Sequence, residues 1–370
     1  MRVNWLAIRD FRNYTQARLD LAAHGLTVVI GENGQGKTNL LEALGWLATL
    51  SSFRGVTNEA LVRQGATNAY VRAEVERDGR TMLLEAEVPL RGAPRVLVNG
   101  NALRRSADLL GALRVSVFSP DDLALVKAGP THRRQLLDDA LVALAPRHAE
   151  TIASVERVLK QRGALLRQAG GKATPEVVST LDVWDAKLAE HGAALVTARR
   201  ELVIRLEPMV AKAYATVATG AAAIGLRYAP SWADDSNDDN LDERAALHAA
   251  LTKARSDDLR RGVTTIGPHR DELDLHIGSL PARTHASQGE QRSLALALRL
   301  AIHDAVTETT GSPPILLLDD VFSELDPQRS SALVAALPAG QALLTTAGHL
   351  PEGASPAATV TIVDGRISAQ

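Results

Sequence analysis

The first third of the chain has the hydrophobic pattern of a β-rich region that contains one helix. Residues 26–30 form a short apolar run with β-branched side chains, which is typical of a buried strand. A glycine-rich turn follows, and the apolar residues of 39–50 then recur at helical spacing. Asp-Gly at 78–79 and Asn-Gly at 99–100 follow strand-like runs, so we expect a β-hairpin at each.

The middle of the chain is helical. Apolar positions recur at three-to-four spacing over 130–168 and 176–218, and the glycines and proline of 169–175 separate these stretches. The arrangement predicts an antiparallel helical hairpin or short coiled coil, with an ordinary helical subdomain as the alternative. The polar run 234–240 lacks the glycine and glutamate that a calcium loop requires, so we expect a solvated linker.

The last third returns to an α/β pattern. We expect a helix over 291–306, strands over 315–318 and 342–345, and a closing hairpin at the Asp-Gly of 364–365. The predicted parts are an N-terminal α/β part, a helical lobe and a C-terminal α/β part, over 1–129, 130–225 and 226–370.

Composition and charge narrow the class of protein. Hydrophobic residues make up 45% of the 370 residues and charged residues 23%, as in globular domains. The net charge is -2, so any binding of nucleic acid needs a local basic patch. The absence of cysteine excludes disulfides, cysteine-ligated metals and thiol catalysis. No apolar run approaches the roughly 20 residues of a membrane span, and the charged N-terminus is no signal peptide. We expect a cytoplasmic protein without a membrane partner.

The strongest motif is GENGQGKT at 31–38, which fits G-x-x-x-x-G-K-[ST] between a predicted strand and a predicted helix. Its glycines let backbone N–H groups face a phosphate, and the following helix directs its positive end at the same anion. We expect Lys37 to contact the β- and γ-phosphates of ATP and Thr38 to ligand Mg²⁺. The ATP-binding residues predicted here are Gly31, Glu32, Asn33, Gly34, Gln35, Gly36, Lys37, Thr38 and Asn39.

A second motif ends the predicted strand 315–318 with Asp319 and Asp320. Many buried strands end in an acid, but together with the phosphate loop this pattern indicates a Walker B motif. We expect Asp319 to hold Mg²⁺ through water, and Asp320 to orient or deprotonate the attacking water.

The third motif is SQGEQ at 287–291, before an Ala/Leu-rich helix. In ABC-type ATPases such a signature binds the γ-phosphate that a second subunit holds, and VFSELD at 321–326 resembles the D-loop of the same interface. The signature residues are Ser287, Gln288, Gly289, Glu290 and Gln291, and the D-loop residues are Ser323 and Asp326. The predicted catalytic residues are Asp320, Lys37 and Ser287.

With these motifs in place, the chain resembles the RecF family of bacterial recombinational repair and replication proteins, relatives of the SMC-type ATPases. The resemblance is spread over nearly the whole chain. Gly163, where a polar residue is expected, and the polar stretch 228–245 depart from it. The matching stretches are IRDFRNY (8–14), GENGQGKTN (31–39), SSFRG (51–55), VFSPDDLALVKAGPTHRRQLLD (117–138), LKQRGALL (159–166), GPHRDEL (267–273), SQGEQRSLALALRLA (287–301) and LLLDDVFSELD (316–326).

The resemblance implies an α/β fold, in which an ABC-type P-loop ATPase head with a mixed sheet and an antiparallel β-subdomain carries a short helical-hairpin lobe. It also implies ATP and Mg²⁺ as cofactors and a weak, DNA-stimulated ATPase. The ATP-bound homodimer would clamp double-stranded DNA and single-strand/double-strand junctions at the nucleoid. With RecR and RecO it would promote RecA loading at gaps and SOS induction, and slow hydrolysis would release it.

Several polar residues keep two interpretations. Arg12 and Asn13 follow the first strand, where they would contact nucleotide or serve the fold. The DNA-binding candidates, each with a structural alternative, are Arg54, Lys127, Arg133 and Arg134. The γ-phosphate sensor stays open among Thr345, Thr346 and His349, with the threonines ahead. Aromatic residues do not interleave with basic ones along the chain, which favours contact with a duplex backbone over base stacking.

Three other functions compete with this interpretation. An ATP-binding subunit of a membrane transporter shares the motif set but has a shorter helical insert. A metabolic P-loop kinase would have no use for SQGEQ, and a scaffold protein would not need Lys37, Thr38, Asp319, Asp320 and Ser287 together.

Overall fold

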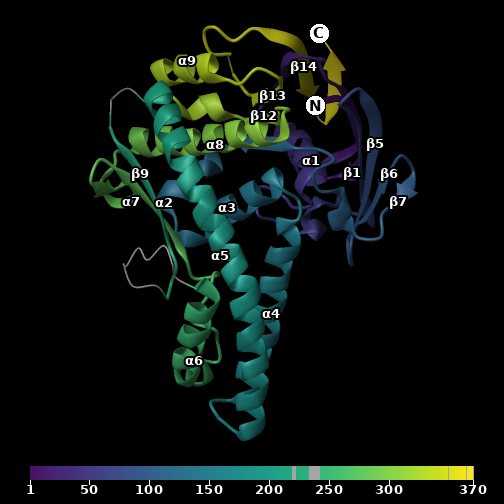
Figure 1. Cartoon of the computed structure of the whole chain (residues 1–370). Coiled ribbons are helices and arrows are strands. Elements are labelled where there is room, and N and C mark those ends of the chain that lie inside the picture. The colour runs from purple at the N-terminus through teal and green to yellow at the C-terminus, as the bar shows by residue number, and fades with distance from the viewer. Residues whose placement is uncertain (219–221, 233–241, 349, 364, 370) are drawn as a thin grey trace. The chain divides into compact units, whose positions relative to one another are not determined.

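The computed structural model describes residues 1–218, 222–232, 242–348, 350–363 and 365–369 (Figure 1). The chain forms two compact units, and each is assembled from separate stretches of sequence. No helix of the described part is long and apolar enough to cross a membrane. Unit 1 comprises Met1–Leu123, Met209–Ala221 and Gln288–Gln370, and unit 2 comprises Ala124–Pro208 and Ala222–Ser287.

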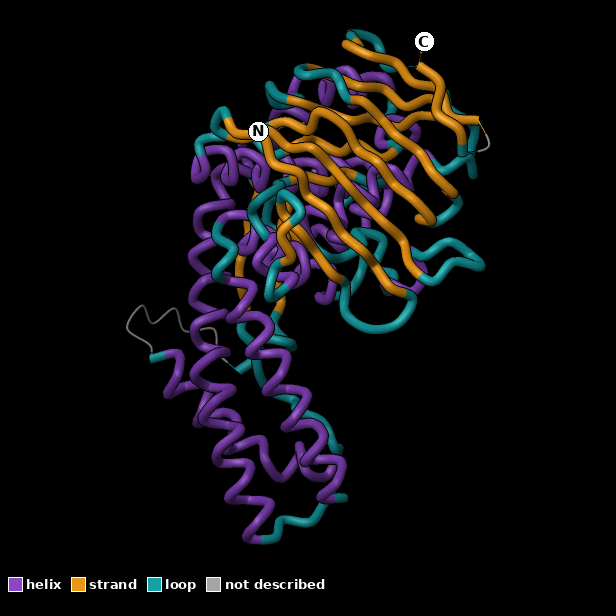
Figure 2. The backbone as a smooth tube through the Cα atoms, turned by 90° about the vertical axis from the view of Figure 1, so that its right-hand side faces the viewer, coloured by secondary structure: helices purple, strands orange, loops and turns teal. Residues whose placement is uncertain are grey.

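Unit 1 contains an antiparallel sheet with the strand order β2-β1-β4-β5-β6-β7. Figure 2 shows its long strands side by side. Both expected hairpins are present, since Asp78 and Asn99 adopt positive φ angles in the turns that precede Gly79 and Gly100. The strands are β1 (Arg2–Phe11), β2 (Tyr14–Asp20), β4 (Asn68–Arg77), β5 (Arg80–Pro89), β6 (Arg95–Val98) and β7 (Asn101–Ala102).

The second sheet of unit 1 has the order β15-β14-β3-β13-β12-β8 and is parallel except for the pair β14/β15. Its central strands are buried on both faces, which explains the continuous apolar runs in the sequence. The strands are β3 (Gly25–Ile30), β8 (Val115–Phe118), β12 (Ile315–Asp319), β13 (Gln341–Thr346), β14 (Pro356–Val363) and β15 (Arg366–Ala369). The predicted hairpin residue Asp364 lies outside the described residues.

Successive residues of β12 face two different apolar clusters. Ile315 and Leu317 join the cluster shared with α1 (Lys37–Thr49) and the antiparallel sheet. Leu316 and Leu318 join the cluster shared with α8 (Gln288–Thr310) and α9 (Pro327–Ala336). Helices therefore cover both faces of the parallel sheet. The short 3₁₀ helices described in this unit are η1 (Asn58–Leu61), η2 (Ser106–Leu109), η3 (Pro120–Leu123) and η4 (Val321–Glu324).

Unit 2 joins helices to a small antiparallel sheet of order β11-β10-β9. The predicted helical hairpin is present, because α4 ends at Gly170 in the left-handed conformation and α5 begins at Pro175. Residues 209–217 of α5 belong to unit 1. The elements are α2 (Ala124–Lys127), α3 (Pro130–Leu144), α4 (His148–Ala169), α5 (Pro175–Val217), β9 (Ile224–Ala229), α6 (Glu243–Arg261), β10 (Glu272–Ile277), β11 (Leu280–Pro281) and α7 (Ala282–His285), with η3 (Pro120–Leu123) just before them.

A buried charged cluster ties α4, α5 and α6 together. The Arg162 side chain is completely buried and donates to Asp185 at 2.7 Å and to Asp258 at 2.6 Å. Because α6 and the strands β9 and β10 are held in unit 2, the division differs from the expected boundary at 226. The sequence there returns to an α/β pattern, but the pattern does not show which sheet the strands enter. The predicted polar linker 234–240 lies outside the described residues.

Candidate functional site

The phosphate loop follows β3, which lies between β13 and β14, and it ends where α1 begins at Lys37. Gly34 and Gly36 have φ angles of 85° and 104°, which side-chain-bearing residues rarely adopt. A Cβ on Gly36 would also lie 2.6 Å from the Asn13 side chain. These glycines therefore let the loop curl around the N-terminal end of α1, an anion-binding arrangement.

The ammonium group of Lys37 is held inside this loop. Its Nζ donates to the carbonyl oxygens of Gly31 at 2.6 Å and Glu32 at 2.9 Å. Burial lowers the pKa of Lys37, and the nearby Asp320 and Asp319 act in the opposite direction. Among the described residues no carboxylate forms an ion pair with Lys37, so its charge is available to an anionic ligand.

The acidic pair stands at the end of β12, beside β13. Oδ1 of Asp319 accepts hydrogen bonds from Thr38 at 2.8 Å and Thr345 at 2.7 Å. Burial raises the pKa of Asp319, and these two hydroxyl groups partly oppose that effect. One carboxylate and one hydroxyl suit Mg²⁺, which keeps most of its ligands as water and phosphate oxygens.

Asp320 has φ 47° and ψ 30°, a left-handed conformation that is uncommon outside glycine. Its N–H donates to the carbonyl oxygen of Thr345 at 3.2 Å and to Oγ1 at 3.0 Å. Of the three sensor candidates, Thr345 therefore contacts both acids, while Thr346 accepts a hydrogen bond from the Gly348 N–H. His349 lies outside the described residues.

Arg12 and Asn13 form the turn between β1 and β2, next to the phosphate loop. Asn13 donates to the carbonyl of Gln35 at 3.1 Å and accepts from Asn39 at 2.8 Å, so it braces the loop backbone. Arg12 instead binds the carboxylate of Glu42 at 2.7 and 2.8 Å. Of the two interpretations kept for Arg12, this placement favours the structural role over nucleotide contact.

Glu42 is a site residue that the sequence reasoning missed. It is fully buried on α1, and Ser52 Oγ also donates to it at 2.5 Å. It thereby fixes the SSFRG segment, and Arg54 approaches it to 3.9 Å. A lone acid within the apolar run 40–48 was the available signal, because a buried carboxylate requires partners.

The signature residues from Gln288 onward form the first turn of α8, and Ser287 directly precedes it. A Cβ on Gly289 would lie 2.7 Å from Nη2 of Arg329, so a side chain here would displace that guanidinium. Arg329 pairs with Asp326, and its Nε donates to Ser293 Oγ on α8 at 3.2 Å. Arg329 therefore links the signature helix to the D-loop, and it too was missed from the sequence.

The D-loop is fixed at two further points. Ser323 Oγ donates to the carbonyl of Asp320 at 2.8 Å, and Asp326 caps α9 by accepting from the Arg329 N–H at 2.9 Å. Arg292 of α8 binds Glu324 through the carbonyl at 2.5 Å and the carboxylate at 2.7 Å. Hydrogen bonds and an ion pair thus connect Asp320 to the D-loop, and the D-loop to the signature helix α8.

Comparison with known proteins agrees with this arrangement. The family model of the RecF/RecN/SMC N-terminal domain matches residues 2–346. The DNA replication and repair protein RecF of Streptomyces avermitilis is 45% identical over 354 residues, which cover 94% of this chain and 93% of the relative. The RecF of Frankia alni is 47% identical over 358 residues, with the same shares covered. The chain belongs to the RecF family.

Solved structures place the fold in the same family. The recombination mediator protein RecF with ATP, of the RecFOR pathway, superposes with a TM-score of 0.91 at 30% identity, and covers 100% of this chain and 97% of that one. An Smc head bound to the C-winged helix domain of ScpA has a TM-score of 0.57 at 15% identity, with 100% and 97% covered. The predicted family and α/β class are therefore confirmed.

The four DNA-binding candidates of this RecF-family chain have different surroundings. Arg133 is buried, and its guanidinium binds Glu272 at 2.7 and 2.8 Å and two main-chain carbonyls of its own unit. Arg134 donates to the carbonyl of Asp271 at 2.7 Å. These contacts favour structural roles for both, whereas Arg54 and Lys127 keep exposed side chains.

Proposed function

We propose that this protein is an ATP-dependent DNA-binding protein of recombinational repair and replication. The observation that carries the proposal is the meeting of Lys37, Thr38, Asp319 and Asp320 at one edge of the parallel sheet of a RecF-family chain. The relatives are named DNA replication and repair proteins, and the structural neighbour is named as a complex with ATP. These matches favour DNA repair over the transporter alternative.

Each residue of this edge has a role in binding or hydrolysis. The N–H groups of residues 33–38 and the Lys37 ammonium bind the β- and γ-phosphates. Thr38 and Asp319 would hold Mg²⁺, which neutralises developing charge on the phosphates. Asp320 accepts the proton of the attacking water, and its conformation is fixed by Thr345.

The signature acts on a nucleotide bound by a second copy of the chain. Ser287 and the N–H groups at the start of α8 supply donors for the γ-phosphate, and the Arg329 guanidinium lies against Gly289 beside them. ATP therefore joins two subunits, and hydrolysis separates them. The link from Asp320 through the D-loop to α8 connects each active site with the signature of the same chain.

The ATP-bound dimer clamps double-stranded DNA and single-strand/double-strand junctions in the nucleoid. With RecR and RecO it promotes RecA loading at gaps and SOS induction, and slow hydrolysis, stimulated by DNA, releases the dimer. The proposal is tested by sedimentation of the full chain with and without ATP and duplex DNA. We expect an ATP-dependent dimer that cosediments with DNA, and Lys37→Ala should abolish both. The exposed Lys172→Ala is the matched control.

Mixing two defective variants tests the composite site directly. We expect Lys37→Ala and Ser287→Arg each to lose ATPase activity, although Ser287→Arg should still bind ATP. A heterodimer of the two has one site with both defects and one with neither, so mixing should restore part of the activity. Normal hydrolysis by Ser287→Arg alone would exclude action in trans, because no second subunit would then need this residue.

A further inference from the structure

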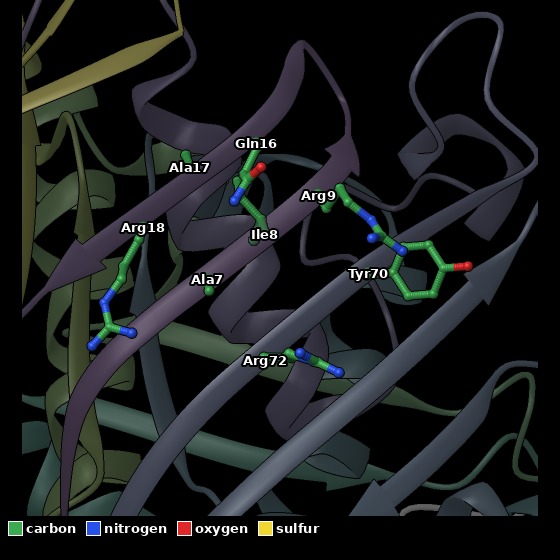
Figure 3. A pocket seen from close by; sticks show the side chains of 8 residues that line it. All are labelled: Ala7, Ile8, Arg9, Gln16, Ala17, Arg18, Tyr70 and Arg72. Carbon is green, nitrogen blue, oxygen red and sulfur yellow. The ribbon is translucent and has the colours of Figure 1, made fainter.

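The outer face of the antiparallel sheet carries a hollow above Ala7 (Figure 3). In the strand register, Ala7 of β1 lies opposite Arg18 of β2 on one side and Arg72 of β4 on the other. Arg9 follows two residues along β1, on the same face. A methyl group is therefore the floor of a depression of about 350 Å³ with three arginines at its sides, within the roughly 300–1,000 Å³ range of ligand sites.

Aromatic rings support two of these arginines. The Cζ atom of Arg9 lies 4.1 Å from the centroid of the Tyr70 ring, and Figure 3 shows this stacked pair at the rim. The Cζ atom of Arg18 lies 4.5 Å from the ring centroid of Trp5. Cation–π stacking orients a guanidinium and leaves its N–H edge free to donate. The fold thus places Arg9 of β1 against Tyr70 of β4 and Arg18 of β2 against Trp5 of β1.

The side chains that line the hollow carry positive charge, and the nearest acids, Asp20 and Glu85, lie outside the lining. None of the eight residues that line it is acidic, and three are arginines. Arg18 pairs with Asp20 at 3.0 Å and Arg72 with Glu85 at 2.9 Å, but these arginine side chains remain 55% and 61% exposed. The Arg18–Asp20 pair is exposed on both sides and contributes little, so a phosphate can replace Asp20 at low cost. Glu85 is only 14% exposed and stays beside Arg72, whose exposed N–H groups still face the hollow. Within the described residues, the Arg9 side chain interacts only with the Tyr70 ring.

We propose that this hollow, defined by Ala7, Arg9, Arg18 and Arg72, binds a phosphate group of the DNA strand. Guanidinium groups match phosphate oxygens in geometry and charge, and the small floor lets the phosphate approach all three. The contact is independent of sequence, since no base edge is read. This inference rests on the proposed DNA-binding function and names the surface that performs it, in place of Arg133 and Arg134, whose guanidinium groups bind partners within unit 2.

The sharpest test is Ala7→Glu, which puts a carboxylate between the arginines. Folding stability should be unchanged or raised, because opposite charges face each other across the strands. The affinity for duplex DNA, measured by fluorescence anisotropy with ATP at about 0.1 M salt, should fall about tenfold or more. The matched control is Ala102→Glu, the same substitution at an exposed position of β7 in the same sheet.

A second variant tests the charges without filling the hollow. Arg9→Gln/Arg72→Gln should reduce the slope of log Kd against log salt by roughly 0.9 for each DNA phosphate that the protein no longer neutralises. Arg80→Gln/Arg104→Gln removes the same charge from exposed positions of unit 1 and should leave the slope nearer to that of the wild type. Unchanged ATP affinity in all four variants separates this surface from the phosphate loop.

The outcomes separate the inference from the function on which it rests. If the wild type binds DNA and neither Ala7→Glu nor Arg9→Gln/Arg72→Gln weakens that binding, the hollow is not the DNA-phosphate site. The proposed function would still stand. No DNA binding by the wild type would remove both. The last experiment measures the binding of inorganic phosphate to the protein by titration calorimetry. Saturable binding that Ala7→Glu abolishes, without any change in DNA affinity, would assign the hollow to a free phosphate compound and overturn the DNA assignment.

Discussion

The edge of the parallel sheet and the charged cluster of unit 2 use the same residue types in opposite ways. At the sheet edge, Lys37 is held by carbonyl oxygens and Asp319 by hydroxyl groups, so neutral partners fix each charge without cancelling it. In unit 2, Arg162 lies between Asp185 and Asp258, and Arg255 also binds Asp185, so guanidinium and carboxylate charges neutralise one another.

The difference teaches where a buried charge can act on a ligand. Charges with neutral partners can turn to an incoming phosphate or metal ion, and no ion pair has to break first. Charges that are paired with each other resist exchange, because removal of one partner leaves the other buried and uncompensated. We therefore expect substitutions at the sheet edge to change function with little effect on stability, and substitutions in the cluster to do the reverse.

The largest expected effect is the loss of stability in Arg162→Ala. It leaves Asp185 and Asp258 without their shared cation, which should lower the free energy of unfolding by about 3–5 kcal/mol in urea titrations. ATP affinity of the folded fraction should be unchanged. Arg157→Ala, at an exposed position of α4, is the control. If Arg162→Ala keeps the stability of the wild type but loses ATP affinity, the contrast between the charged cluster and the sheet edge is wrong.

The next effect belongs to the sheet edge. Asp320→Asn keeps the shape of the side chain but removes the proton acceptor, so ATP hydrolysis should slow about 10²-fold or more, as for other general bases. ATP binding and the midpoint of urea unfolding should stay close to those of the wild type. Asp121→Asn, an exposed acid of the same unit, should hydrolyse ATP normally. Wild-type turnover in Asp320→Asn would show that another group takes the proton.

A buried group with a neutral partner provides the smallest effect and sharpens the comparison. His303 of α8 contacts Ser116 Oγ at 3.0 Å, and burial lowers its pKa to about 4. Above the ordinary histidine pKa of about 6.5, the His303 side chain is neutral in both the folded and the unfolded state, so it does not contribute to the pH dependence of stability. As the pH falls from there to about 4, only the unfolded chain takes up the proton, so stability is lost.

His303→Gln should remove this part of the pH dependence. Between about pH 7.5 and pH 4 its unfolding free energy should fall less than that of the wild type, by up to about 3 kcal/mol. The measurement is urea unfolding at each pH, with His24→Gln as an exposed control. An equal decline in His303→Gln and wild type would assign the acid sensitivity elsewhere, for example to His269, whose pKa burial also lowers to about 4.

Much of the fold and the centre of the site could be predicted from short stretches of sequence. The phosphate loop that ends at Lys37 could be predicted because its glycines, the strand before it and the helix after it lie next to one another in the sequence. The acids at 319 and 320 could be predicted as site residues because they end an apolar strand. Their position beside the phosphate loop could be predicted because parallel strands end at the same side of a sheet. The hairpins at Gly79 and Gly100 depend only on their own turns.

The rest depends on residues that meet from distant parts of the chain. Arg133 sits in a helical pattern that fits an exposed face, yet Glu272 of β10 lies against it and buries it. Glu42 gains its role only when Arg12 arrives from the β1–β2 turn. Arg9 meets Tyr70 because β4 is the neighbour of β1, and no local pattern states that pairing.

The central position of β3 has a consequence for synthesis of the protein. This strand is made early, but its neighbours in the sheet are β13 and β14, near the opposite terminus. Until β13 and β14 have been synthesised, β3, the strand that precedes the phosphate loop, has no partner strands. Unit 2 is complete once Ser287 has emerged, whereas unit 1 needs nearly the full chain. A nascent polypeptide that lacks β13 and β14 should therefore be unable to hold nucleotide, so nucleotide binding waits until both strands have been made.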